Sequence, residues 1–138
     1  MALDLTSFEK GINSLDEALT SYNQSAFPEG SKDRNLLRDA VIQRFEYTFE
    51  LARKFLKRYM KMFGMEQPDM STHKDFFRQA FEQGMIRDSA AWFEYLKKRN
   101  ITSHTYDQEV AADVFKSIPA FLADAKLVLV RMKEKAVD

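Results

Sequence analysis

Residues 42–57 read IQRFEYTFELARKFLK, and they decide the fold because their apolar side chains cover two adjacent stripes of one helix. Apolar residues spaced three and four positions apart line one face of an α-helix. The first stripe contains Val41, Phe45, Thr48, Ala52, Phe55, Tyr59 and Met62, and the second contains Ile42, Phe49, Leu56 and Phe63. A surface that wide must face more than one neighbour, so we predict that a helix over residues 33–63 is the central helix of a bundle.

A second amphipathic helix is predicted before the central one. It covers residues 4–23 and is followed by the polar stretch SAFPEGSKD, which reads as a loop because it contains Pro28 and Gly30. After the central helix, Gly64 is the expected helix stop and Pro68 the sign of a loop.

Two shorter helices are predicted to follow this loop. Ser71 is a candidate N-cap for a helix over residues 72–83, and Gly84 is its expected end. Asp88 is a candidate N-cap for the next helix, which reaches the vicinity of Asn100.

A last helix is predicted over residues 108–135, with Asp107 as its N-cap. Pro119 lies inside its apolar pattern and removes a backbone donor, so we expect a kink or a short break near Ser117. No run of alternating apolar and polar residues predicts a strand. The sequence therefore predicts an all-α fold, an up-and-down bundle of four to five helices in one domain over residues 1–138.

The composition excludes several classes of function. Lys and Arg number 21, as do Asp and Glu, and this zero net charge argues against broad attraction to nucleic acid or anionic membrane. The absence of cysteine excludes disulfides, thiolate metal sites and cysteine nucleophiles. The two histidines, His73 and His104, have no metal-binding spacing, so neither a metal nor a cofactor is predicted.

No membrane partner is predicted either. No apolar run approaches the ~20 residues that span a bilayer. The start, MALDLTSFEKG, has no basic segment followed by an apolar stretch, so no secretion signal is visible and we expect a cytoplasmic protein.

Residues 99–107, RNITSHTYD, interrupt the helical pattern with polar and β-branched side chains. On an ideal helix Arg99 and His104 would face directions roughly 140° apart. If the helix ends near residues 101–103, the chain can turn and bring His104 back towards the guanidinium of Arg99. Thr102 and Ser103 favour such an end, because they are moderate helix formers.

In that geometry these side chains have the chemistry for cleaving RNA without a metal. Arg99 can hold a phosphate through a forked pair of hydrogen bonds. The imidazole of His104 can transfer protons near neutral pH, and Asn100 can orient a ligand oxygen or the imidazole. A base would activate the ribose 2′-hydroxyl, and a cation would stabilise the charged phosphorane.

A purely structural interpretation of the same stretch stands beside this one. Lys97, Lys98 and Arg99 close a helix, where cations meet the negative end of the helix dipole. His104 and Tyr106 would then belong to a polar loop with one aromatic ring against the core. The R-x-x-x-x-H pattern is short and often arises by chance, so its spacing alone leaves both interpretations open.

Arg99-Asn100 followed by His104 and Tyr106 matches the R-N-x-x-x-H and R-x-x-x-x-H-x-Y patterns of HEPN domains, which are small helical bundles of bacteria and archaea. Residues 42–57 resemble the corresponding helix of the nucleotidyltransferase substrate-binding protein-like family, a HepT-like branch of the HEPN domains. NITSHTYD, residues 100–107, is similar to the end of that family's fourth helix. The resemblance covers nearly the whole chain in helix order and length.

The resemblance implies a homodimer around a two-fold axis, in which the Arg and His of each protomer line a shared cleft. It also implies a partner, a small minimal nucleotidyltransferase. In HepT-like systems the HEPN subunit is a ribonuclease toxin and the nucleotidyltransferase is its antitoxin, and in some of them the partner transfers AMP from ATP to the tyrosine of the H-x-Y element. An older interpretation treats the helical subunit as the substrate-binding half of a two-component nucleotidyltransferase.

Carried over to this sequence, the resemblance implies that Arg99 binds the scissile phosphate, His104 is the acid/base, Asn100 assists and Tyr106 accepts AMP. Such a modification would place a bulky anion two residues from His104, where it would oppose RNA binding. We therefore expect a metal-independent ribonuclease toxin that the partner inhibits by binding or by AMPylation. The alternatives are a non-catalytic substrate-binding subunit and a helical interaction protein with a relic motif.

Two further groups of residues have alternative roles. Glu46, between Ile42 and Phe49, either pairs with Arg99 and orients it or forms ordinary ion pairs at the helix flank. Trp92 and Tyr95 either pack in the core or a dimer interface, or stack on a base.

The central helix also carries a basic run, which contains Arg53, Lys54, Lys57, Arg58 and Lys61. This run is a solvated face, a track for RNA or a docking surface for an acidic partner. His73 is expected to lie at a solvated helix start.

Overall fold

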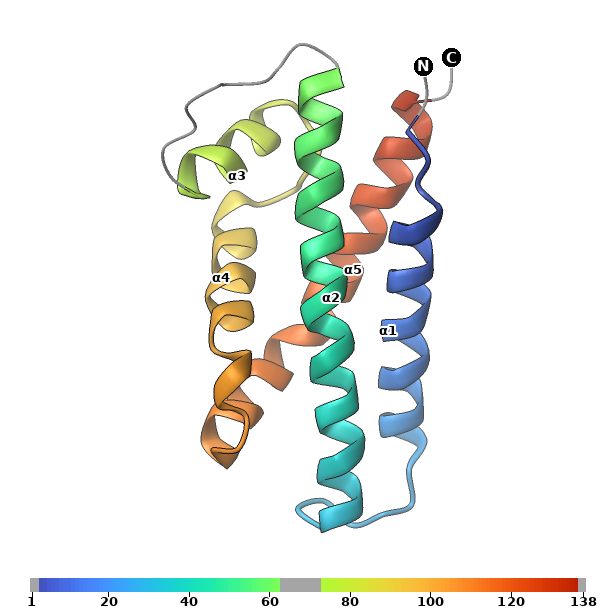
Figure 1. Cartoon of the computed structure of the whole chain (residues 1–138), viewed down its shortest axis with the longest axis vertical. Helices are drawn as coiled ribbons and strands as arrows, with labels where there is room; N and C mark the ends of the chain where they lie inside the picture. Colours follow the sequence, from blue (N-terminus) through green and yellow to red (C-terminus); the bar gives the residue numbers. More distant parts are fainter. Residues whose placement is uncertain (1–2, 63–72, 137–138) are drawn as a thin grey trace.

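The computed structural model describes residues 3–62 and 73–136, which form five α-helices and one 3₁₀ helix. The α-helices are α1 Thr6–Gln24, α2 Lys32–Met62, α3 His73–Glu82, α4 Ser89–Asn100 and α5 Gln108–Ala136, and the 3₁₀ helix η1 is Thr102–His104. These described residues contain no strand. Helices α1, α2, α4 and α5 run alternately down and up (Figure 1), which confirms the predicted all-α bundle.

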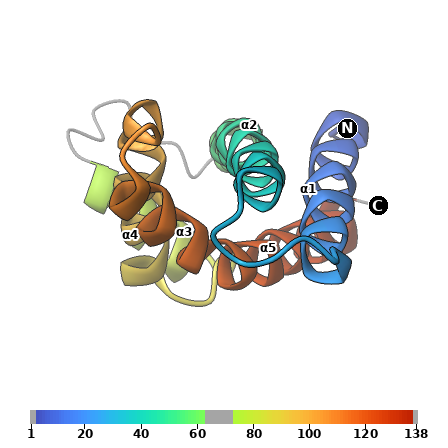
Figure 2. The same cartoon turned by 90° about the horizontal axis from the view of Figure 1, so that it is seen from below.

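Helix α2 is the central helix of the bundle, as predicted. Helix α1 lies on one side of it and α4 on the other, while α5 crosses beside it from the α4 side to the α1 side (Figures 1 and 2). The buried apolar residues of α2 are Val41, Ile42, Phe45, Phe49, Ala52, Phe55, Leu56, Tyr59 and Met60. Met62 is half-buried, and Phe63 of the predicted stripe lies outside the described residues.

Helices α1 and α2 approach each other closely at Gly11. A Cβ atom on Gly11 would lie 2.8 Å from Cδ1 of Leu51 and 3.4 Å from Oγ1 of Thr48. The buried Thr48 hydroxyl donates to the Gly11 carbonyl over 3.0 Å. A glycine therefore permits a backbone approach that a side chain would oppose.

A cluster of aromatic side chains fills the space between α2, α3, α4 and α5. Phe49, Phe77, Trp92 and Phe121 are fully buried, and Tyr95 is only 5% exposed. The Trp92 ring centroid lies 6.1 Å from those of Phe49 and Phe77. It lies 5.6 Å from those of Tyr95 and Phe121. Core packing of Trp92 and Tyr95 is thus confirmed, and the alternative that they stack on a base is wrong because both rings are buried.

A buried hydrogen bond ties α4 to α5 beside this cluster. The Tyr95 hydroxyl donates to Oδ2 of Asp124, whose side chain is 5% exposed, and Arg87 lies 2.8 Å from the other carboxylate oxygen. Burial, together with the hydrogen bond to the Asp124 carboxylate, raises the pKa of Tyr95 above its ordinary value of 10.0.

This raised pKa predicts a loss of stability at high pH. Below about pH 10 the phenol is protonated in both states, but above it the unfolded chain loses the proton more readily than the folded chain. We expect Tyr95→Phe to be less stable than wild type by about 1–3 kcal/mol near neutral pH, because Asp124 loses a buried donor. The difference in the free energy of unfolding between the two proteins should shrink as pH rises above about 10, by at most ~1.4 kcal/mol per pH unit.

Urea denaturation of both proteins over this pH range measures that difference. A difference that stays constant at alkaline pH would contradict the prediction, because it would mean that Tyr95 loses its proton equally readily in the folded and unfolded chains.

Both predicted aspartate caps are confirmed. Oδ1 of Asp88 accepts hydrogen bonds from the backbone N–H groups of Ala90 at 2.9 Å and Ala91 at 3.2 Å. Oδ1 of Asp107 accepts the N–H of Glu109 at 2.9 Å. The two carboxylates thus satisfy amides that the first turns of α4 and α5 would otherwise leave without partners.

The predicted end of α3 is also confirmed. Gly84 has a positive φ of 77° just after the helix, and the N–H of Met85 donates back to the carbonyl of Ala80 over 2.9 Å. This arrangement ends a helix and favours glycine at the left-handed position. At the other end, His73 lies exposed in the first turn of α3, as predicted. The predicted roles of Gly64, Pro68 and Ser71 fall outside the described residues.

Two local predictions differ from the structure. Helix α1 begins at Thr6 rather than at residue 4, because the Asp4 carboxylate accepts hydrogen bonds from the N–H and hydroxyl of Thr6. Helix α5 runs through Pro119 without interruption, so of the kink or short break expected near Ser117 the break is wrong. Pro119 lies on the exposed face of α5, where water can serve the carbonyl that loses its helical donor.

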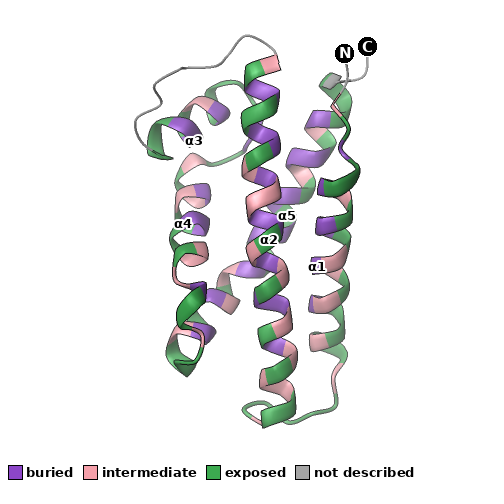
Figure 3. Ribbon diagram, in the orientation of Figure 1, coloured by how far each residue is buried: buried purple, intermediate pink, exposed green. Residues whose placement is uncertain are grey.

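Burial differs sharply between the middle of the bundle and one of its ends. Buried segments recur along the long helices, whereas the turn between α4 and α5 is mostly exposed (Figure 3). No helix of the described residues is both long and apolar enough to cross a bilayer.

Candidate functional site

The motif residues lie where α4 ends and the chain turns through η1 into α5. Helix α4 ends at Asn100, which confirms the predicted helix end. Backbone hydrogen bonds of 3.0–3.2 Å then follow every third residue, from Ile101 to Lys98, from His104 to Ile101 and from Asp107 to His104. The turn that carries His104 is therefore held by its own backbone at both ends.

The side chain of Arg99 lies against α2, between two carboxylates. Its Nε is 2.8 Å from Oε2 of Glu50, and its Nη1 is 3.5 Å from Oε2 of Glu46. The contact of Nε with Glu50 is an ion pair but not a hydrogen bond, because the N–H of Nε does not point at an acceptor. Glu46 thus pairs with Arg99, as one of its two predicted roles requires, and Glu50 lies closer still.

Further contacts extend this group of charges. Thr102 is buried, and its hydroxyl lies 2.9 Å from Oε2 of Glu46 and 2.8 Å from the Arg99 carbonyl, so its single proton serves one of them at a time. Arg53 Nη2 is 3.1 Å from Oε1 of Glu50. We call Glu46, Glu50, Arg53 and Arg99 the Arg99 cluster, and its formal charges sum to zero.

The Arg99 cluster leaves part of the guanidinium available. The Arg99 side chain is 30% exposed, and its Nη2 forms no hydrogen bond or ion pair with any described residue. The two carboxylates orient the guanidinium, and they also compete with any anion for it.

His104 and Tyr106 form a separate, exposed pair. Nδ1 of His104 lies 3.3 Å from the Tyr106 hydroxyl, and the ring centroids are 5.9 Å apart at an interplanar angle of 70°. Tyr106 is 80% exposed, which makes its hydroxyl accessible for modification. Asn100 is exposed too, and its side chain makes no hydrogen bond to a described residue.

The structure therefore brings the predicted residues together in two pairs rather than in one site. Arg99 meets Glu46, and His104 meets Tyr106. Within the described part of the chain, no hydrogen bond or ion pair joins Arg99 or Asn100 to His104. The convergence of the guanidinium and the imidazole on one phosphate stays a prediction.

Sequence reasoning missed Glu50 and Thr102. A signal for Glu50 was present, because it follows Glu46 by four residues and so lies on the same face of α2. The contact of Thr102 with Glu46 joins residues 56 positions apart, and no local pattern reports such a distance.

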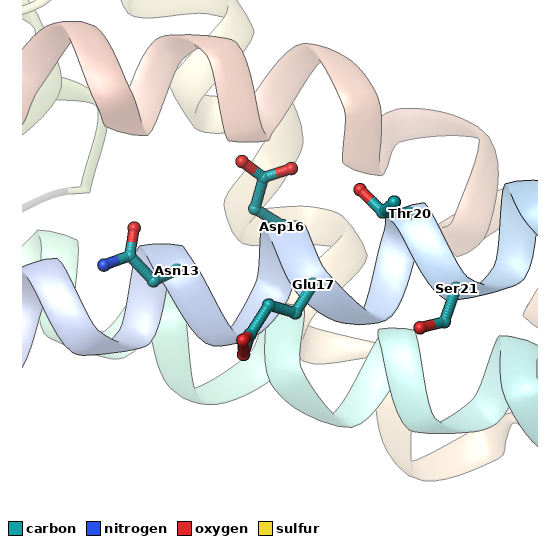
Figure 4. Close-up of a pocket in the computed structure, with 5 residues that line it drawn as sticks. All are labelled: Asn13, Asp16, Glu17, Thr20 and Ser21. Atoms are coloured by element: carbon teal, nitrogen blue, oxygen red, sulfur yellow. The ribbon is translucent and has the colours of Figure 1, made fainter.

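A polar hollow on the surface lies apart from these residues. It has a volume of about 660 Å³ and is open to solvent, and it is lined by Asn13, Asp16, Glu17, Thr20 and Ser21. All of these lie on α1, and Asp16 and Glu17 point to different sides of that helix (Figure 4). Among the described residues no three His, Cys, Asp or Glu side chains are grouped as metal ligands would be.

Comparison with known proteins gives a consistent result. A family model described as nucleotidyltransferase substrate binding protein like matches residues 3–134. A curated protein of Haemophilus influenzae, named "Probable ribonuclease HepT", is 34% identical in an alignment of 137 positions that covers 90% of this chain and 92% of that protein.

Two solved structures are similar over most of their length. One, from Haemophilus influenzae, is described as the fold of a substrate-binding domain of a nucleotidyltransferase. It has a TM-score of 0.85 and 31% identity and covers 94% of this chain and 99% of its own. A crystal structure from Thermus thermophilus has a TM-score of 0.65 and 33% identity, and it covers 86% and 98% of the two chains.

Proposed function

Because the chain belongs to the nucleotidyltransferase substrate-binding protein-like family, we propose that it is the HEPN-type toxin of a two-gene system, a metal-independent ribonuclease that a minimal nucleotidyltransferase inhibits. One observation carries this proposal. At one end of the bundle the motif supplies an exposed imidazole beside an exposed phenol, directly after a guanidinium that two carboxylates orient. A curated relative named as a ribonuclease adds support.

The proposed chemistry is a transfer within the RNA chain. The ribose 2′ oxygen attacks the adjacent phosphorus and gives its proton to His104, while the bond from phosphorus to the 5′ oxygen breaks and this oxygen takes up a proton from water. When Nδ1–H of a neutral His104 donates to the Tyr106 oxygen, Nε2 is free to accept that proton. Arg99 stabilises the charge on the phosphorane, and Asn100 orients the phosphate oxygen.

The complete site is proposed to form in a homodimer. In one chain Arg99 is directed to α2, while His104 contacts Tyr106. A second copy of the chain, packed around a two-fold axis at this end of the bundle, would bring a second guanidinium and a second imidazole to the cleft. Light scattering of the purified protein measures the oligomeric state, and a monomer that cleaves RNA would contradict this part of the proposal.

Cleavage in the presence of excess chelator tests the proposed activity. Attack by the 2′ oxygen leaves a 2′,3′-cyclic phosphate on one fragment and a 5′-hydroxyl on the other, whereas metal-dependent nucleases that use water leave no cyclic phosphate. We expect the cyclic product with chelator present, and we expect the partner nucleotidyltransferase to suppress it. Fragments with other ends, or no fragments, would refute the ribonuclease proposal.

The Tyr106 hydroxyl is the proposed site at which the partner acts. Its oxygen would attack the α-phosphorus of ATP and lose its proton, and pyrophosphate would leave. Because this oxygen lies 3.3 Å from His104, the added adenylyl anion would block the imidazole sterically and oppose the approach of RNA phosphates.

We expect mass spectrometry to detect one added AMP unit per chain after incubation with the nucleotidyltransferase and ATP. Tyr106→Phe should remain unmodified, because it has no hydroxyl to react. Tyr47→Phe is the matched control, since Tyr47 is a second exposed tyrosine, at 40%, and its variant should still be modified. Modification that persists in Tyr106→Phe would mean that another residue accepts AMP.

A second candidate function is a non-catalytic, substrate-binding subunit of a two-component nucleotidyltransferase. The zero charge of the Arg99 cluster favours it, because carboxylates already occupy two nitrogens of the guanidinium that would bind a phosphate. This alternative predicts no cleavage, together with tight association with the nucleotidyltransferase in a pull-down.

A further inference from the structure

A row of exposed lysines runs along one face of α2. Lys54, Lys57 and Lys61 are exposed, and none of them forms an ion pair with a described residue. They recur at steps of three and four, so their directions around the helix lie within about 60° of one another. We call these three residues the basic stripe.

The cations at the end of α4 differ from the basic stripe because carboxylates already hold them. Lys97 lies 3.2 Å from Glu94, and Lys98 lies 2.9 Å from Asp113. Arg99 lies between Glu46 and Glu50. These ion pairs weaken the attraction of the motif for an anionic polymer, so such a ligand needs positive charge from elsewhere on the surface.

The basic stripe begins one turn from the Arg99 cluster. Glu50, which contacts Arg99, precedes Lys54 by four residues and so lies on the same face of α2. Arg53 connects the two, since its Nη2 is 3.1 Å from Glu50. From Glu50 to Lys61 the helix rises by about 16 Å, so the stripe extends along the surface from the candidate phosphate-binding arginine.

The chemistry of the stripe favours a phosphate backbone over a protein surface. Protein interfaces rely on buried aromatic and apolar anchors. The exposed large apolar side chains of the described residues are Phe27, Leu36, Tyr47, Phe81, Tyr106 and Val130. None of them lies between Glu50 and Lys61, the part of α2 that carries the stripe. The lysines rise by steps of about 4.5 and 6 Å, which lie between the ~3.4 Å rise of one nucleotide of a stacked strand and the rise of two.

We propose that the basic stripe binds consecutive or alternate phosphates of a single-stranded RNA and leads the strand to Arg99. This inference rests on the proposed ribonuclease function and assigns its substrate class. A single row of cations fits one strand rather than two, and lysine-to-phosphate contacts carry no sequence information. The affinity should therefore depend steeply on salt and little on sequence.

Binding of a short fluorescein-labelled oligouridylate, followed by anisotropy over a range of salt concentrations, tests the stripe. The His104→Ala background prevents cleavage during the measurement. The stripe variant carries Lys54→Gln, Lys57→Gln and Lys61→Gln, which preserve helix propensity and remove charges that form no ion pair with a described residue. The matched control carries Lys10→Gln, Lys32→Gln and Lys135→Gln, three exposed lysines that likewise have no ion pair with a described residue.

Each lost contact with a single strand lowers the slope of log affinity against log salt by about 0.7. For the three lysines of the stripe variant we therefore expect a slope lower by about 2 and an RNA affinity lower by about 100-fold at 0.1 M salt. The control should remain within about twofold of the background, because the same charge is removed away from the stripe. Circular dichroism confirms that both variants are folded.

The outcomes separate this inference from the proposed function. Equal RNA affinity of the stripe variant and the control overturns the stripe as an RNA track, whether or not wild type cleaves. Unchanged RNA affinity with a lost nucleotidyltransferase complex also overturns it and assigns the stripe to the protein partner. RNA binding that requires the stripe, without cyclic-phosphate products from wild type, supports the track and refutes the ribonuclease.

Discussion

Replacement of His104 by alanine is expected to lower the rate of RNA cleavage by about 10²–10⁴-fold, the usual contribution of a general acid or base. The fold should be unaffected, because His104 is exposed and its side chain contacts the exposed Tyr106 rather than the core. We expect the free energy of unfolding to change by less than about 0.5 kcal/mol. Cleavage of a labelled RNA in excess chelator and urea denaturation measure the two quantities.

His73→Ala is the matched control for this experiment. His73 is the other histidine of the chain, and it is exposed in the first turn of α3 rather than next to the motif. The control should cleave like wild type. Equal cleavage by His104→Ala and wild type would instead reveal a contaminating nuclease and leave His104 without a role.

Replacement of Trp92 by alanine is expected to lower the free energy of unfolding by about 3–5 kcal/mol, the largest effect on stability that the fold predicts. Trp92 is fully buried, and its ring lies within 6.1 Å, between centroids, of four other aromatic rings from α2, α3, α4 and α5. Its removal leaves a cavity where these helices meet. A domain of this size has only about 5–15 kcal/mol of stability in total, so the variant should be marginally folded.

Trp92→Phe provides a graded comparison. Phenylalanine keeps an aromatic ring in the cluster, and it removes an indole N–H that has no acceptor among the described residues. We therefore expect less than half of the loss caused by alanine. Because Trp92 is the only tryptophan, denaturation must be followed by circular dichroism. An alanine variant as stable as wild type would mean that the aromatic cluster does not hold the bundle together.

The sequence predicted most of the fold because local patterns report it directly. The two apolar stripes of residues 42–57 identified α2 as the central helix, and the caps Asp88 and Asp107 marked the starts of α4 and α5. Of the kink or short break predicted near Ser117, the break is absent because Pro119 costs the helix one hydrogen bond on a solvent-exposed face of α5, and the sequence pattern does not report that exposure.

The candidate site was less accessible to sequence reasoning, since its contacts join distant segments. The pairing of Glu46 with Arg99 was anticipated as one of two roles, because a carboxylate between apolar neighbours on a central helix must find a partner. The closer Glu50 shares that face of α2 and was overlooked. In the proposed homodimer, the approach of Arg99 to His104 depends on packing between two chains, which no spacing within the sequence reports.

The backbone hydrogen bonds through η1 have a consequence for how such proteins can diverge. Every third amide from Ile101 to Asp107 donates to the carbonyl three residues earlier. These hydrogen bonds fix the conformation of the segment between α4 and α5. An inserted or deleted residue would break this series of hydrogen bonds and change the position of α5 relative to α4, which would misalign both the aromatic interior and the imidazole. The length of this turn is therefore constrained by folding itself, even in descendants that no longer use the histidine, and so are the buried Thr102 and the capping Asp107.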